Sequence, residues 1–372
     1  MKYKSISLHI SSSCNLACNY CYIAEQGAMR NEMMSFDTAI SAIQEYLSPD
    51  GTISFFGGEP LFNSALVIDV VSWCKENMPD VKFHITTNGT LITEGVALFL
   101  SMYHFSVIVS LDGDKDIHNS IRKTKDGKGS YFKVMEGLYY LKKYNVPVTI
   151  RATFTPKNTN LLERTKHLHL LLDNKLCNAC SIEPINETES VCTTGIGFTL
   201  QDVDNLAKEY HQVVDFLIER TKQGKSVSFH QIMYMVHRIK SGKYWFSECG
   251  AGLGCISVTP DKKVYSCHKL GKTGIGELYN LSEDKLKEWK HNHITNNEIC
   301  QNCDVFMICG GPCRYQSLQF DGTQTTPDPV ACAFRRLWIE SAKQYIKGIK
   351  DGDKRQNTKS PSWCCKDNTT QP

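Results

Sequence analysis

The 17 cysteines of this 372-residue chain are unevenly spaced, and their spacing restricts the possible folds more than any other feature. Three fall within one short segment near the N-terminus, and eight more crowd the last third of the chain (Cys14, Cys18, Cys21, Cys249, Cys255, Cys267, Cys300, Cys303, Cys309, Cys313 and Cys332). The remaining cysteines are scattered, and we expect no metal-binding role for them (Cys74, Cys177, Cys180, Cys192, Cys364 and Cys365). Cysteines at this density form either disulfides or metal sites.

Composition and the N-terminal sequence favour metal over disulfides. The formal net charge is +3 and 41% of residues are hydrophobic, which is ordinary for a globular protein and does not indicate a nucleic-acid binder. No apolar run approaches the ~20 residues of a membrane-spanning helix, and the opening MKYKSISLHI lacks the features of a secretion signal. We therefore expect a cytoplasmic protein without a membrane or nucleic-acid partner, whose thiols stay reduced and bind metal.

The first 223 residues alternate between strand-like and helix-like hydrophobic patterns, which predicts βαβ units and a parallel sheet. Six segments have strand patterns (3–10, 52–56, 82–86, 107–111, 146–153 and 179–185). Six segments have helical patterns (36–47, 61–71, 96–100, 131–144, 161–172 and 206–217). Six units are fewer than the eight of a closed barrel. We expect an α/β fold with a partial (β/α)6 TIM barrel, and an open sheet is the alternative.

The rest of the chain has a different character. Residues 224–248 are mixed in composition and are predicted to be a connector, after a barrel domain at 1–223. Short segments rich in glycine and cysteine follow, which predicts a second domain at 249–345 that metal stabilises. Residues 346–372 are polar and are predicted to form a tail.

The cysteine triplet Cys14-x3-Cys18-x2-Cys21 directly follows the first predicted strand. Four thiolates saturate a [4Fe–4S] cluster, so three leave one iron free to bind a small molecule. A structural zinc site is the alternative, and it needs a fourth ligand, for which His9 is a candidate. Because His9 lies inside the strand pattern, the spacing favours the cluster.

This triplet, with the aromatic Tyr20 before its last cysteine, resembles the signature of radical S-adenosylmethionine (SAM) enzymes. Further motifs follow in the order of that family, each at a strand end or on a strand (Gly57-Gly58-Glu59-Pro60, Thr87-Asn88-Gly89, Ser110-Leu111-Asp112-Gly113 and Arg151). Each motif alone is also an ordinary turn or a core residue. Their joint order supports the resemblance, which covers about residues 3–220.

The resemblance implies a cofactor site. SAM would chelate the open iron, accept an electron from the reduced cluster and yield a 5′-deoxyadenosyl radical, which takes a hydrogen atom from the substrate. Glu59 of the GGEP motif would accept a hydrogen bond from the cofactor ammonium. The other strand-end residues would contact its ribose and carboxylate (Tyr20, Gly57, Gly58, Pro60, Thr87, Asn88, Ser110, Asp112 and Arg151).

The second cysteine set is Cys300-x2-Cys303-x5-Cys309-x3-Cys313 with a later Cys332. Together with three earlier cysteines it provides eight thiolates, enough for two fully ligated [4Fe–4S] clusters, and two zinc sites are the alternative. The set resembles the SPASM extension of radical SAM enzymes that modify peptides. That resemblance implies one cluster on Cys249, Cys255, Cys267 and Cys313, and another on Cys300, Cys303, Cys309 and Cys332. Clusters without a free iron would relay electrons, and a purely structural role is the alternative.

One position departs from that pattern, because Lys262 stands where the extension has a glycine, five residues before Cys267. The spacing is close to that of anaerobic sulfatase-maturating enzymes, which oxidise a Cys or Ser of a protein to formylglycine. Those enzymes have an aspartate after the third auxiliary cysteine, and this chain has His268. Histidine can act as a base near neutral pH. We expect His268 to be either that base or a solvated loop residue.

The wider resemblance predicts a maturase of a ribosomally made precursor peptide that forms a thioether, carbon–carbon or ether crosslink. No separate leader-binding domain fits before the first strand, so we expect the peptide to dock on the barrel, on the cysteine-rich region or through a partner. Flavodoxin or ferredoxin would supply electrons. Sulfatase maturation is the nearest alternative. An iron–sulfur electron carrier or a zinc-stabilised binding module is the alternative of another class.

Overall fold

The computed structural model describes residues 2–21, 32–185, 196–243, 249–292, 296–311 and 313–350. Its strands in this part of the chain form one sheet in the order β10-β9-β8-β7-β1-β2-β3-β4-β5-β6. The first six strands are parallel neighbours in chain order (β1 Tyr3–Ser11, β2 Leu47–Gly57, β3 Lys82–Thr87, β4 Ser106–Ser110, β5 Val148–Phe154 and β6 Ala179–Pro184). The predicted α/β fold with a parallel sheet is confirmed.

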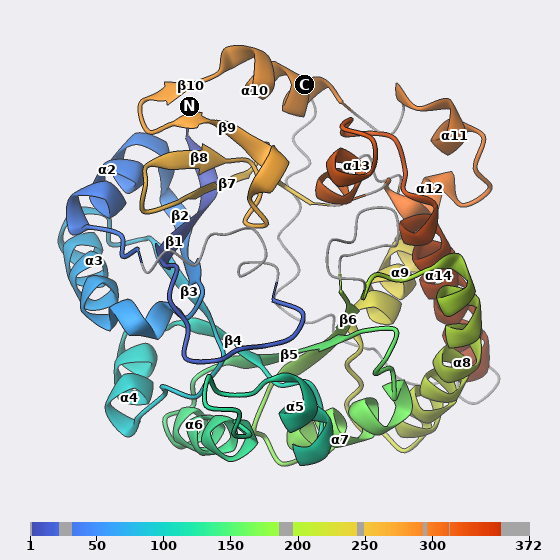
Figure 1. Ribbon diagram of the computed structural model, residues 1–372. Coiled ribbons are helices and arrows are strands. Elements are labelled where there is room, and N and C mark those ends of the chain that lie inside the picture. The colour runs from blue at the N-terminus through green and yellow to red at the C-terminus, as the bar shows by residue number, and fades with distance from the viewer. Residues whose placement is uncertain are drawn as a thin grey trace.

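Helices cover the outer side of the curved sheet, as Figure 1 shows. They follow the strands in turn (α2 Phe36–Tyr46, α3 Ser64–Asn77, α4 Glu94–Met102, α5 Lys115–Ile121, α6 Tyr131–Lys143, α7 Leu161–Asp173 and α8 Leu200–Lys222). The apolar side chains of alternate strand residues pack against them, and Ile6, Leu8 and Ile10 of β1 are completely buried. The other face of each strand points to the inside of the partial barrel.

The predicted segments differ from the observed ones mainly at their ends. β2 begins at Leu47 rather than at residue 52, because Leu47 pairs with Tyr3 of β1 beyond the apolar run. α8 extends well beyond 206–217, since Thr199 and Asp202 form a capping box at its start. α5 was not predicted: its seven residues are too short for a hydrophobic period to show.

The predicted connector at 224–248 contains the helix α9 (His230–Ser241), which packs on β6 and on the C-terminal helix α14 (Pro329–Lys350). α14 also lies along α8, as Figure 1 shows. The cysteine-rich segment therefore contacts the barrel through the long helix α14. The three predicted domain boundaries stay predictions. The predicted tail at 346–372 begins within α14 and otherwise lies outside the described residues.

The cysteine-rich segment also continues the barrel sheet. β7 (Cys255–Val258) is parallel to β1, with Ser5 opposite Cys255, and three antiparallel strands extend the edge (β8 Lys263–Tyr265, β9 Gly274–Glu277 and β10 Asn280–Leu281). Four short helices complete it (α10 Glu283–His291, α11 Glu298–Gln301, α12 Phe306–Cys309 and α13 Arg314–Phe320). Lys262, in place of the glycine of the SPASM pattern, has φ of +65° in the β7–β8 turn, so the turn forms in a conformation that glycine favours.

Candidate active site and cluster sites

The first cysteine triplet lies in the loop after β1, at the carboxyl edge of the parallel strands. Cys14 is buried, and Cys18 and Cys21 are partly exposed. The Leu16 N–H and the Asn88 side-chain amide both point at the Cys14 sulfur, at 3.4 Å and 3.7 Å. Burial raises the pKa of the Cys18 thiol to about 11. The two donors at the Cys14 sulfur fit a cluster ligand.

The GGEP motif at the end of β2 packs closely against the start of this loop. The Gly58 N–H donates to the Ser11 carbonyl at 2.8 Å, and the Glu59 N–H donates to the Ser13 carbonyl at 2.8 Å. A Cβ on Gly57 would lie 2.1 Å from the Ser11 oxygen, and a Cβ on Gly58 would lie 2.4 Å from the Ser13 oxygen. Two backbones approach too closely here for any side chain, just before the triplet begins.

We expect Gly58→Ala to destabilise the protein by ~2–3 kcal/mol, because the backbone must move to admit the methyl group. The same displacement should lower the iron content by about four atoms, the content of one cluster. Gly127→Ala is the matched control, because Gly127 has φ of +81° and open space around it. Gly127→Ala should lower the free energy of unfolding by ~1 kcal/mol and leave the iron content unchanged. Urea unfolding and iron analysis test this, and equal iron loss in both variants would contradict it.

Glu59 links the ends of β2 and β3 and is completely buried. One carboxylate oxygen accepts from the Leu61 N–H at 3.1 Å and the Thr87 hydroxyl at 2.7 Å, and the other accepts from the Asn88 N–H at 2.7 Å. Burial outweighs these bonds and raises the pKa of Glu59 to about 7. The chain itself provides these partners, so a bond from Glu59 to the cofactor stays a prediction.

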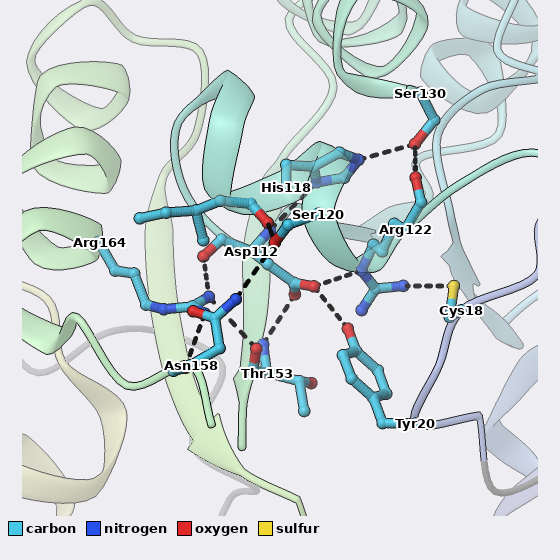
Figure 2. Close-up of polar contacts among 11 residues, drawn as sticks. Cys18, Tyr20, Asp112, His118, Ser120, Arg122, Ser130, Thr153, Asn158 and Arg164 are labelled. Carbon is cyan, nitrogen blue, oxygen red and sulfur yellow. Dashed lines mark hydrogen bonds and ion pairs between the residues drawn. The ribbon is translucent and has the colours of Figure 1, made fainter. Parts of the chain in front are cut away.

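Asp112, after β4, is the centre of a buried polar network, which Figure 2 shows. Its carboxylate accepts from the Tyr20 hydroxyl at 2.6 Å, from Arg122 Nε at 2.9 Å and from the Thr153 N–H at 2.8 Å. Arg122 also donates to the Cys18 sulfur at 3.9 Å. The network thus ties the cluster loop to the ends of β4 and β5.

Arg164 of α7 completes the network from the other side and is itself completely buried. It donates to the backbone oxygens of Asp112, Thr153 and Asn158. Burial opposes ionisation of Asp112, but the charges of the two arginines, Arg122 and Arg164, lower its pKa. Because these contacts use both carboxylate oxygens of Asp112, its predicted contact with the cofactor stays a prediction.

The inner face of the sheet carries another group of polar residues. Arg151 of β5 lies beside Ser110 of β4 in the strand register, and its Nε is 3.5 Å from a carboxylate oxygen of Glu183 at the end of β6. The His268 ring packs edge-on against Phe56 of β2, with 5.3 Å between ring centroids. Burial holds the pKa of His268 well below its usual range. His268 itself is half-buried, and its role as a base stays a prediction.

The eight C-terminal cysteines lie in two groups, and each group contains the members of one predicted ligand set. The residue Cys249 as a whole is exposed, but its thiol is desolvated, and this desolvation raises the thiol pKa. The nearby thiols of the other three cysteines of its set raise that pKa further (Cys313, Cys255 and Cys267). Burial and then the nearness of its own three partners raise the pKa of Cys332 to about 12 (Cys309, Cys300 and Cys303). All four cysteines of this second set line one pocket. Their binding of iron stays a prediction.

Cys332→Ala should remove about four irons and leave the irons of the other sites, because three thiols cannot complete a fully ligated cluster. Cys74→Ala is the control, since Cys74 is completely buried in the barrel core. It should leave the iron content unchanged. Iron analysis of anaerobically reconstituted protein measures both. Loss of all iron in the Cys332 variant would show that the two sites are not separate.

A zinc ion and a four-iron cluster require different spacings of their thiolates. Four thiolates on one zinc lie ~4 Å apart, given Zn–S bonds of ~2.3 Å in a tetrahedron. A four-iron cluster holds its thiolates further apart, because each binds a different iron atom. Within the ranges that the structure describes, no three His, Cys, Asp or Glu side chains converge tightly enough for a single ion. His9 of β1 instead packs edge-on against Phe56 at 5.1 Å.

Three of the scattered cysteines lie in the core, and for Cys74 this position was predicted. Cys74, Cys177 and Cys180 are buried and unbridged, and the Cys180 thiol donates to the Ser228 carbonyl at 3.1 Å. The other three lie outside the described residues (Cys192, Cys364 and Cys365). None of the helices in the described ranges is long and apolar enough to span a bilayer.

Comparison with known sequences identifies the domain. The profile of the Radical SAM superfamily matches residues 8–170. An uncharacterised protein of Methanocaldococcus jannaschii is 37% identical over 164 residues, and the chain spans only 56% of its length. A cysteine-type anaerobic sulfatase-maturating enzyme of Clostridium perfringens is 28% identical over 82% of this chain and 86% of its own. The radical SAM cyclopropyl synthase TigE of Paramaledivibacter caminithermalis is 25% identical over 93% of this chain and 75% of its own.

Solved structures agree in fold. Native anSMEcpe with bound AdoMet superposes with a TM-score of 0.76 at 22% identity, covering 93% of this chain and 99% of that one. Streptococcus suis SuiB bound to its precursor peptide SuiA superposes with a TM-score of 0.63 at 18% identity, covering 89% and 76%. The chain therefore contains a radical SAM domain. Its sequence is similar to a cysteine-type anaerobic sulfatase-maturating enzyme and to a radical SAM cyclopropyl synthase.

Three residues of the site were not predicted: Arg122, Arg164 and Glu183. The two arginines lie on or after helices that follow the strand-end motifs, where a charged residue is ordinarily part of a solvated face. Glu183 is the second-last residue of β6. Its position near a strand end was a usable signal, because the predicted site residues lie at or near the ends of the other five barrel strands. The arginines had no such signal.

Proposed function

We propose that this chain is a radical SAM maturase that takes a hydrogen atom from a residue of a ribosomally made precursor peptide and forms an oxidative crosslink. The bond would be a thioether, a carbon–carbon bond or an ether. The observation that carries this proposal is the place of the cysteine triplet, at the open edge of a partial barrel, together with two further groups of four thiols. The incomplete set would leave one iron free for a cofactor, and clusters on the complete sets could accept electrons.

Different residues of the chain would bind the cluster and the cofactor at the first site. Cys14, Cys18 and Cys21 would hold a [4Fe–4S] cluster, and SAM bound at its open iron would supply the radical chemistry. Ser110 and Arg151 lie side by side on the inner face and would bind the cofactor carboxylate. These residues lie on rigid strands, which orient the cofactor with little loss of entropy.

The inner face would then hold the substrate residue and receive its proton. His268 packs on Phe56 inside the barrel, where burial keeps the imidazole neutral. A neutral imidazole can accept a proton as a bond forms on the substrate. The two sets of four thiols would hold clusters without a free iron, which accept the electron that the substrate gives up.

Sulfatase maturation is the second candidate, and the 28% identity to the Clostridium perfringens enzyme over most of both chains favours it. The two activities differ in their product. Formylglycine made from cysteine has lost its sulfur, whereas a crosslinked peptide has lost two hydrogen atoms and no heavy atom. Flavodoxin or ferredoxin would supply the first electron in either case.

The test is anaerobic turnover with SAM, a reductant and either of two peptides. One is a short precursor encoded beside the gene, and the other is a sulfatase-derived peptide with a central cysteine. Mass spectrometry should find loss of two hydrogens in the precursor and no change in the sulfatase peptide. Sulfur loss in the second peptide would support sulfatase maturation. Iron-loaded protein that cleaves no SAM would exclude both and leave an electron carrier.

A further inference from the structure

Arg122 lies against one of the cysteines predicted to hold the first cluster. It ends α5, and it is 9% exposed. Its guanidinium has three partners: the Asp112 carboxylate at 2.9 Å, the Cys18 sulfur at 3.9 Å and the face of the Tyr20 ring at 5.3 Å. The side chain thus holds a fixed cation against one ligand of the triplet, as Figure 2 shows.

We propose that Arg122 is a positioning residue whose buried positive charge raises the reduction potential of the cluster on the triplet. The inference rests on the proposed function, because it requires a cluster at Cys14, Cys18 and Cys21. SAM cleavage begins when this cluster gives up one electron, so its potential controls how often it is reduced. Hydrogen bonds to ligand sulfurs and nearby charges are established means of setting that potential.

The charges in the network have the required sign. Asp112 is negative, and Arg122 and Arg164 are positive, so the buried network carries one net positive charge. His118 adds none, because burial lowers its pKa to about 4. The Tyr20 hydroxyl donates a hydrogen bond to the Asp112 carboxylate and is therefore neutral. A cluster with three thiolates carries one net negative charge when oxidised and two when reduced. A neighbouring cation therefore stabilises the reduced form more.

The contacts distinguish the two arginines. Arg164 directs its N–H groups to backbone oxygens and to Asn158, all on the barrel side of the network. Arg122 directs Nη1 to the Cys18 sulfur, while Asp112 and the Tyr20 ring fix the plane of its guanidinium. Only Arg122 therefore combines charge and a donor at a ligand, among the arginines of this network.

The experiment is a redox titration of the anaerobic holoenzyme, followed by the EPR signal that changes when SAM is added. Arg122→Gln keeps a donor and removes the charge, and it should lower the reduced fraction about tenfold at a fixed potential. That change corresponds to a midpoint ~59 mV more negative for one electron. Arg122→Lys keeps the charge and should stay within about threefold of the wild-type reduced fraction.

Arg220→Gln is the matched control, because Arg220 is similarly buried and makes a two-point ion pair with Asp173, on α8 and α7. It should leave the midpoint unchanged. Asp112→Asn should shift the midpoint potential in the opposite direction. It removes the negative charge beside Arg122 and should make the midpoint more positive. This variant tests the proposal if Arg122→Gln loses its iron.

Equal shifts in the Gln and Lys variants would overturn the proposal, as would no shift in an iron-loaded Gln variant or a negative shift in Asp112→Asn. If the wild-type protein has no SAM-sensitive EPR signal, the proposed function fails together with this inference. A SAM-sensitive signal with an unaltered midpoint in the Gln variant overturns this inference alone.

Discussion

Replacing Cys14, Cys18 and Cys21 together with alanine should abolish SAM cleavage and remove about four of ~12 irons. No other thiol of the described chain lies in this loop, so no ligand remains for a cluster at the barrel edge. The two C-terminal groups are built from different segments and should keep their irons. Product analysis for 5′-deoxyadenosine and iron analysis of the same sample measure the two effects.

Cys177→Ala is the control for this variant, because Cys177 is buried at the outer end of the barrel core and belongs to no group of ligands. It should keep all irons and normal SAM cleavage. If the triple variant still cleaved SAM, the cofactor would bind elsewhere and the proposed active site would be wrong. If it lost all iron, the three sites would depend on one another for folding.

Asp112→Ala should destabilise the protein by ~3–5 kcal/mol, because it leaves buried charges without a partner. Arg122 and Arg164 would face each other without the carboxylate between them, and the Tyr20 hydroxyl would lose its 2.6 Å acceptor. The cluster loop would also lose its link to β4. Urea unfolding of the reduced protein should show the loss as a lower midpoint.

Asp50→Ala is the matched control, since Asp50 pairs with Lys4 on the surface, at 2.9 Å and with 64% of its side chain exposed. Exposed ion pairs of this kind contribute less than ~1 kcal/mol. Similar losses in the two variants would mean that burial of the Asp112 network adds nothing to stability. A stable Asp112→Ala protein that fails to bind iron at the triplet would mean that the network orders the cluster loop but does not stabilise the whole fold.

The two variants of Asp112 separate stability from electron transfer. Alanine removes both the charge and the hydrogen-bond acceptors, and its main effect should be on folding. Asparagine keeps an acceptor and removes the charge, so its main effect should be on the potential of the cluster. The same residue thus supports the loop mechanically and moderates the charge of Arg122.

Local sequence patterns were sufficient for much of the architecture. Alternating patterns and short apolar runs that end in turn residues predicted all six barrel strands. The same patterns placed the triplet, GGEP and the later motifs at strand ends, and parallel strands bring those ends to one edge of the sheet. Helix ends and the short helix α5 were less predictable, because capping and length rather than hydrophobic period determine them.

The amino-acid sequence by itself determined the parallel α/β sheet and the motifs that follow its strands, since both depend on residues close together in the chain. Only the tertiary structure decided what Asp112 and Glu59 contact, that Arg122 reaches Cys18 and that His268 packs on Phe56. Those partners are far apart in sequence, as with Tyr20 and Asp112 at a separation of 92 residues. Contacts of that range depend on how the whole sheet curves, and no local pattern encodes them.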